Sequence, residues 1–143
     1  MRALGVDYGT RRIGVAVSDE LGLGARGVTT LCDLRDRDAI GRLADLAREL
    51  GVEAIVVGLP VRADGSAGDA AERVGRFAKR LATAVDLPVH TIGEYLTSFA
   101  AEERLRQMGV KESERKRRLD ETAAVIILEE YLAGGVRERR EHG

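Results

Sequence analysis

Two apolar segments, separated by a short polar stretch that contains glycine, open the chain in the manner of paired β-strands. Residues 3–8 and 13–18 each predict a strand, and residues 9–12 between them have the composition of a hairpin turn. In the second segment every other residue is Ile or Val, and the residues between them are Gly, Ala and Ser. We therefore expect one face of this strand to be small enough for a helix to pack closely on it.

Further along the chain, helical periods alternate with short apolar runs. Residues 27–31 predict a third strand, and Asp36 is expected to cap a helix that runs to Leu50 and stops at Gly51. Residues 54–58 form a continuous apolar run, which is typical of a central strand covered on both faces.

The second half of the chain repeats this alternation. The segments expected here are a loop over 59–68, a helix over 70–85, a strand over 89–92 and a helix from a cap at Thr97 or Ser98 to about Met108. A basic, flexible segment and a last helix over 119–132 follow, and glycines at 134 and 135 end that helix. This order predicts an α/β fold with a mixed five-stranded sheet, in which three antiparallel meander strands are joined by two parallel strands and flanked by helices.

Composition changes this outline only slightly. The chain has 143 residues, which suits one domain over residues 1–135, followed by a charged tail over 136–143. The formal net charge of −1 favours no class of partner, although 33% of the residues are charged and local clusters can matter. Aromatic residues make up only 3% of the chain, which weakens any model built on stacking of single-stranded bases.

Three further features bear on location and on candidate nucleophiles. Cys32 is the single cysteine, so an internal disulfide is excluded and a reducing compartment is favoured. No apolar run reaches the roughly 18 residues of a membrane span, and the N-terminus does not have a signal-peptide pattern, so we expect a cytoplasmic protein. We expect Cys32 to be a small buried or loop residue, and His90 to be a strand residue that faces solvent or a polar partner.

Asp7 is the first candidate for chemistry. It lies near the end of the first apolar strand, where an ionised carboxylate is costly without a partner. Its two interpretations are a residue that shapes the following turn and a ligand that holds a metal ion.

Asp120 and Glu94 are the other acidic candidates. Asp120 shares a helical stripe with Ala124, Ile127 and Tyr131, so its side chain should face the sheet, unless it serves only as a helix cap. If the residues before it continue the helix, the cap interpretation weakens. Glu94 follows a strand directly, at the edge where open α/β sheets build sites, although an ordinary exposed glutamate is the simpler interpretation.

Three carboxylates on separate elements can approach one another only if a positive charge lies between them. Oxygen ligands of this kind suit Mg²⁺ or Mn²⁺, and two such ions about 3.5–4 Å apart promote hydrolysis of a phosphodiester. The sequence alone does not show that Asp7, Glu94 and Asp120 converge.

The chain resembles the YqgF family, also called RuvX, over about residues 2–133. The motifs that carry the resemblance are residues 4–9 (LGVDYG), 12–19 (RIGVAVSD), 56–60 (VVGLP), 64–66 (DGS), and Asp120 with Ala123 and Ala124. The resemblance implies an RNase H-like fold and a metal-dependent nuclease with an acidic site of Asp7, Glu94 and Asp120. The family's members are described as pre-16S rRNA nucleases that act in 5′-end maturation and as Holliday-junction resolvases.

The flanks of Glu94 depart from this family. The family usually reads Asp-Glu-Arg where this chain has Gly93, Glu94 and Tyr95. The loss of the arginine is expected to alter the grip on a substrate phosphate rather than to remove the metal site.

A nucleic-acid substrate also fits the basic residues that precede Asp120. The candidates for phosphate contact, including two at the first hairpin, are Arg11, Arg12, Lys111, Arg115, Lys116, Arg117 and Arg118. The alternative is a solvated helix end of mixed charge.

Two other classes of function stay open. The segment from Asp7 to Thr10 resembles the phosphate-binding hairpin of actin-like ATPases and sugar kinases, but the chain has room for only one of the two domains that those proteins need. A non-catalytic RNA-binding module on an RNase H-like scaffold is the other alternative. RNA trimming requires only a monomer, whereas paired cuts in a four-way DNA junction favour a symmetric homodimer.

Overall fold

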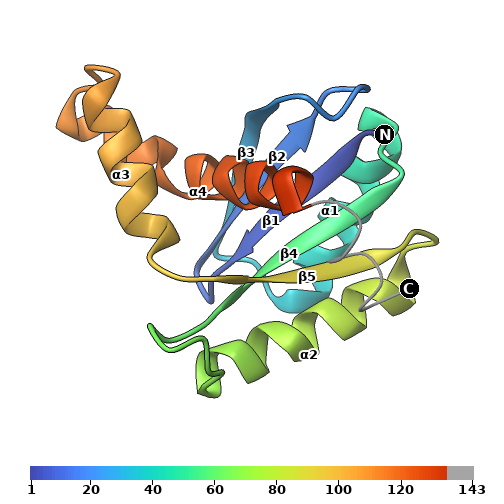
Figure 1. The fold of residues 1–143 in the computed structure, drawn as a ribbon. Helices are drawn as coiled ribbons and strands as arrows, with labels where there is room; N and C mark the ends of the chain where they lie inside the picture. The colour runs from blue at the N-terminus through green and yellow to red at the C-terminus, as the bar shows by residue number, and fades with distance from the viewer. Residues whose placement is uncertain (135–143) are drawn as a thin grey trace.

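The computed structural model describes residues 1–134, and the predicted tail over 136–143 lies outside the described residues. Its centre is one five-stranded sheet with the strand order β3-β2-β1-β4-β5. Strands β1, β2 and β3 form an antiparallel meander, and β4 and β5 are added parallel to β1 (Figure 1). The strand bounds are β1 Ala3–Tyr8, β2 Arg12–Ser18, β3 Ala25–Cys32, β4 Ala54–Pro60 and β5 Val89–Glu94. The predicted mixed sheet is confirmed.

Four helices surround this sheet in the described part of the chain. Helices α1 (Asp36–Leu50) and α2 (Asp69–Ala84) cover one face, and α4 (Glu112–Gly134) crosses the other (Figure 1). Helix α3 (Thr97–Gln107) packs against α4 through Ala101, and the α3–α4 pair extends beyond the sheet (Figure 1). Within residues 1–134, no helix combines the length and the apolar character that a membrane span requires.

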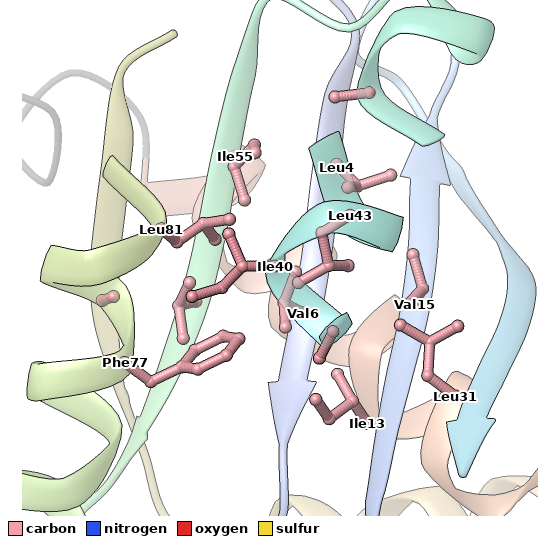
Figure 2. Packing of buried hydrophobic residues seen from close by; sticks show 14 of the residues in the cluster. Leu4, Val6, Ile13, Val15, Leu31, Ile40, Leu43, Ile55, Phe77 and Leu81 are labelled. Atoms are coloured by element: carbon pink, nitrogen blue, oxygen red, sulfur yellow. The ribbon is translucent and has the colours of Figure 1, made fainter. Parts of the chain in front are cut away.

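The larger of the two cores lies between the sheet and helices α1 and α2. Leu4, Val6 and Val15 project from β1 and β2 toward Leu43 of α1 and Phe77 of α2 (Figure 2). Because side chains alternate along a strand, the residues between these apolar ones face α4 on the opposite side.

The face of the sheet under α4 consists largely of small residues, as predicted for residues 13–18. A Cβ atom on Gly14 would overlap the carbonyl oxygen of Asp120, and one on Gly5 would lie 2.9 Å from the carbonyl oxygen of Ala124. The α4 backbone therefore lies directly on the strand backbones, which larger residues at these two positions would prevent.

The structure corrects the predicted start of the last helix. Helix α4 begins at Glu112, so the segment expected to be basic and flexible is helical. This part of the helix carries charged side chains and no continuous apolar stripe, and it is held by pairs such as Arg117 with Glu114 at 3.0 Å.

Two predicted caps are also wrong. The residue before α1 is Arg35, and Asp36 is the first helical residue. Helix α3 is preceded by Leu96 in the left-handed region at φ 58°, and no side chain caps it. The hydroxyl group of Thr97, one of the two predicted caps of this helix, instead donates a hydrogen bond to the Glu94 carboxylate. Other segment ends shift by one or two residues, and β4 and β5 extend to Pro60 and Glu94 because those two residues pair with each other.

Candidate active site

Asp7 faces the candidate site because side chains along β1 point alternately to the two faces of the sheet. Leu4 and Val6 point into the core under α1 and α2, so Ala3, Gly5 and Asp7 face α4. In the antiparallel register Asp7 lies opposite Gly14 of β2. The carboxylate therefore projects beside the place where α4 approaches the sheet most closely.

Asp120 is brought to the same place by α4. Because α4 starts eight residues earlier, Asp120 is an interior helical residue, and the interpretation as a helix cap is excluded. Its backbone packs on Gly14, directly across from Asp7. The Nε of Arg12 donates a hydrogen bond to Oδ2 of Asp120 at 2.9 Å, so a cation already neutralises this carboxylate.

Glu94 is the last residue of β5 and is buried. It lies on the α4 face with His90 and Ile92, and its Oε1 accepts a hydrogen bond from the Thr97 hydroxyl at 2.5 Å. Its Oε2 is buried without a hydrogen-bond partner. The interpretation of Glu94 as an ordinary exposed glutamate is therefore wrong.

The ionisation of these groups is strongly perturbed. Burial, followed by the negative charge of Asp120, raises the pKa of Asp7 from 3.8 to about 7. Burial raises the pKa of Glu94 from 4.5 to about 8. The neighbouring carboxyl group of Glu130 is the next largest cause, and the negative charge of Asp7 adds to the rise. The pKa values rise chiefly because these carboxylates are buried, and nearby acidic side chains add to the effect.

Two neighbouring cavities divide the acidic residues. Asp7 and Glu94 line one cavity of about 340 Å³, together with Tyr95, Leu96 and Phe99. Asp120 lines a second cavity of about 510 Å³. The other residues that line the second cavity are Arg12, Thr30, Cys32, Lys116, Arg117 and Leu119. Within residues 1–134, no three Asp, Glu, His or Cys side chains are arranged as they stand to hold a metal ion.

The donor set nevertheless fits a divalent cation. Asp7 and Glu94 offer only carboxylate oxygens, which are the ligands that Mg²⁺ and Mn²⁺ prefer. The unpartnered Oε2 of Glu94 and the raised pKa values of both residues are features that a bound cation would satisfy.

Two residues of this site were missed by sequence reasoning. Thr97 was taken for a cap, although it orients Glu94, and its position three residues after Glu94 was the available signal. Glu130 lies three residues after Ile127, which contacts the same part of the sheet as Glu94. Nothing in the sequence pattern singles out Glu130 among the charged residues of α4.

The basic candidates have different surroundings. Lys111 and Lys116 are exposed at the start of α4, and Arg118 is half-buried there. Arg11 pairs with Asp33 at 3.5 Å at the first hairpin. Arg115 turns inward: its side chain is only 16% exposed, and its Nη1 donates to the carbonyl oxygen of Val110 at 2.8 Å.

His90 and Cys32 differ in their exposure to solvent. His90 is buried and stacks on Tyr131 with 5.7 Å between ring centroids, so of its two predicted settings, solvent or a polar partner, the first is excluded. Cys32 is an exposed free thiol and the last residue of β3, so the prediction of a small buried or loop residue is wrong.

Comparisons with known proteins agree with this architecture. A structure described as T. thermophilus RuvC in complex with a Holliday-junction substrate superposes with a TM-score of 0.60 at 21% identity, over 94% of this chain and 95% of that one. A Fowlpox virus resolvase bound to Holliday-junction DNA gives a TM-score of 0.53 at 10% identity, over 94% and 98% of the two chains. At these identities the similarity shows the fold, which is the predicted RNase H-like fold.

Sequence relatives are much more similar. A protein of Syntrophus aciditrophicus named "Putative pre-16S rRNA nuclease" is 47% identical over 132 residues, which cover 92% of this chain and 88% of the relative. A Geobacillus protein of the same name is 44% identical over 134 residues, covering 92% and 97%. The family model described as "RuvX: Holliday junction resolvase" matches residues 1–134. The chain therefore belongs to the RuvX family.

Proposed function

We propose that this protein is a divalent-metal-dependent nuclease that hydrolyses phosphodiester bonds of precursor ribosomal RNA, in 5′-end maturation of pre-16S rRNA. The observation that carries the proposal is the pair Asp7 and Glu94, which face one cavity with raised pKa values while Asp120 lies alongside. The names of the relatives supply the substrate class.

In this proposal Asp7, Glu94 and Asp120 hold Mg²⁺ or Mn²⁺, and two ions fit the number of carboxylates. Such ions, when bound, activate a water molecule and stabilise the leaving oxygen. The chain's own contribution is positional: β1 and α4 place the two aspartates across Gly14, and Thr97 fixes one oxygen of Glu94 so that the other stays available. The raised pKa values mean that Asp7 and Glu94 bind metal in competition with protons.

The phosphate backbone is held by the basic side chains near Asp120. Lys116, Arg117 and Arg12 line the cavity next to the acidic pair, Arg11 adjoins Arg12 in the first hairpin, and Lys111 and Arg118 lie near the start of α4. Arg12 has two successive roles: it neutralises Asp120 in the free protein and contacts phosphate once a metal ion replaces it. We propose the cytoplasm as the location, because a free exposed Cys32 suits a reducing compartment.

The test is a cleavage assay with the full chain. Labelled precursor 16S rRNA is incubated with Mn²⁺, with Mg²⁺ or with EDTA, and the Asp7→Asn and Glu94→Gln variants are run beside the wild type. We expect cleavage only with a divalent ion and a loss of at least about 100-fold in each variant, because each removes a charged ligand. Cleavage that survives EDTA or Asp7→Asn would contradict the metal mechanism, and binding without cleavage under every ion would favour an RNA-binding module.

Synthetic four-way DNA junctions form a second arm of the assay, because the matching family is described as a Holliday-junction resolvase. Faster, paired cutting of the junction than of the RNA would assign that substrate. It would also require a symmetric homodimer, which sedimentation of the protein–junction complex detects.

A further inference from the structure

The few aromatic side chains of this protein are unevenly distributed. The chain has three Tyr and two Phe, all within the described residues. Phe77 and Tyr131 are buried, and Tyr8 packs on Phe77 with ring centroids 4.2 Å apart. Only Tyr95 and Phe99 are strongly exposed among the described residues, at 53% and 64%. Exposed rings in a chain so poor in aromatic residues call for a reason, because burial against apolar neighbours is their usual state.

Both exposed rings lie at the candidate active site. Tyr95 and Phe99 line the same cavity as Asp7 and Glu94. Tyr95 directly follows Glu94 at the end of β5, and Phe99 lies in the first turn of α3. The rings are therefore carried by the ends of regular elements rather than by a long loop.

The connection between the two rings is short and sterically restricted. Leu96 joins β5 to α3 with φ 58°, a conformation that costs a residue other than Gly about 1–2 kcal/mol. Thr97, the next residue, is tied to the Glu94 carboxylate. The position of the rings is thus coupled to the position of Glu94.

Charge and apolar surface lie on different sides of the acidic residues. Among the described residues, no Lys or Arg lines the cavity that holds the two rings, whereas Arg12, Lys116 and Arg117 line the cavity on the Asp120 side. A nucleotide has the same asymmetry: its phosphate is anionic and its base presents a flat, apolar face. With the phosphate at the carboxylates, the cationic cavity suits the neighbouring backbone and the ring-lined cavity suits a base.

We propose that Tyr95 and Phe99 stack on an unpaired nucleobase adjacent to the scissile phosphate, so that the site selects single-stranded RNA. The proposal rests on the nuclease function proposed above and adds the substrate's conformation. Bases inside a duplex are already stacked on both faces, so only an unpaired base can offer a face to these rings. Stacking on an aromatic side chain contributes about 1–3 kcal/mol per base.

The test measures binding separately from cleavage. The full chain carrying Asp7→Asn, which keeps the RNA intact, is titrated with a 12-nucleotide RNA that contains 2-aminopurine, alone and annealed to its complement. Affinity is read by fluorescence anisotropy and stacking by quenching of 2-aminopurine. We expect Tyr95→Leu and Phe99→Leu to weaken single-strand binding by roughly 5- to 150-fold, to leave duplex binding unchanged and to abolish the quenching.

Leu23→Ala is the matched control, because Leu23 is an exposed apolar residue in the β2–β3 connection and lines no part of the site cavity. It should change neither readout, and the melting temperatures of the leucine variants should equal that of the parent. Equal losses on single strand and duplex, or unchanged quenching, would overturn the proposal. Self-association that Phe99→Leu abolishes in sedimentation would assign the rings to a second copy of the chain and also overturn it.

The two proposals fail separately. If cleavage never occurs but the rings still quench 2-aminopurine, the nuclease function fails and stacking stands. If metal-dependent cleavage occurs and both leucine variants bind and cleave normally, stacking fails and the nuclease function stands.

Discussion

The carboxyl group of Asp7 opposes folding when it is ionised, because it is buried on a strand near two other acidic residues. Burial, followed by the charge of Asp120, raises its pKa from 3.8 to about 7. Between these two pH values the folded protein keeps a proton that the unfolded chain has released, so stability falls as the pH rises across this window. A residue that only shaped a turn would not carry this cost.

We therefore expect Asp7→Asn to stabilise the metal-free protein, with a gain that is smallest in acid and grows as the pH rises to about 7. The amide cannot ionise and so escapes the penalty. Urea unfolding in EDTA across this pH range measures the difference. Parallel pH profiles for the variant and the wild type would contradict the shift in the pKa of Asp7.

Asp19→Asn is a control of opposite sign. The backbone N–H groups of Leu23 and Gly24 donate to the Asp19 carboxylate at 3.0 and 2.9 Å and lower the pKa of this exposed group. Its contribution to stability is present at neutral pH and is lost as the pH falls. Asp19→Asn should therefore destabilise the protein at neutral pH, and the difference should shrink in acid.

At the scale of elements, α4 is the part that turns a sheet into a candidate site. It lies on small residues of β1, β2 and β4, and its contact with Gly14 is made by backbone rather than by a side chain. A flexible side chain can move aside for an added methyl group, but the helix backbone can yield only by moving as a whole.

We expect Gly14→Ala to destabilise the protein by about 1–3 kcal/mol and to lower cleavage activity, because the added Cβ overlaps the Asp120 carbonyl and shifts α4. Gly41→Ala and Gly75→Ala, inside α1 and α2, are matched controls, since nothing lies within 4 Å of a Cβ there. They should stabilise by about 0.5–1 kcal/mol. Thermal unfolding of the three variants measures these differences. An unchanged melting temperature in Gly14→Ala would contradict the close approach of the α4 backbone to β2.

The elements that could be predicted from the sequence are those with a buried stripe. Residues 3–8 form a largely apolar, buried segment, and the small residues of β2 indicated a closely packed helix. The first turns of α4 could not be predicted, because residues 112–118 are all charged or polar and leave no apolar period. The end of β5 at Glu94 depends on its pairing with Pro60 of another strand, which hydrophobicity does not encode.

The candidate acidic residues could be picked out from the sequence, but their surroundings in the fold could not. Asp7 and Asp120 stood out because each is a charge on an apolar strand or stripe. The ion pair between Arg12 and Asp120 joins residues 108 positions apart, so no local pattern indicates it. The scarcity of aromatic residues argued against base stacking, yet the two exposed rings both lie at the site cavity, so their placement outweighs their number.

For the whole molecule, the distribution of charge matters more than its sum. The net charge of −1 gives no overall attraction to a polyanion, but cations line the cavity beside Asp120. Binding to nucleic acid should therefore depend on a few local contacts, and each contact releases counterions.

We expect Lys116→Gln and Arg117→Gln each to reduce the slope of log K against log salt by roughly 0.7 for single-stranded RNA, with little change in stability. Arg115→Gln should affect stability and not the slope, because the Arg115 guanidinium donates a hydrogen bond to the carbonyl oxygen of Val110 at the α3–α4 connection. It should lower the melting temperature and leave the slope unchanged. Affinities at several salt concentrations, together with thermal melts, test both; a smaller slope in Arg115→Gln alone would reassign phosphate binding to that residue.

The glycines under α4 also determine where harmful mutations should arise. Gly5 and Gly58 lie beneath Leu128 and Ile127, the second of which lines the site cavity, and neither glycine has a side chain that could take part in a reaction. A genetic screen for lost activity should nevertheless recover substitutions at both positions, because an added Cβ meets the Ala124 carbonyl oxygen of α4 at Gly5 and the side chains of Ile127 and Glu94 at Gly58. These two glycines therefore matter to the candidate site because the absence of a side chain leaves room for α4 and Glu94.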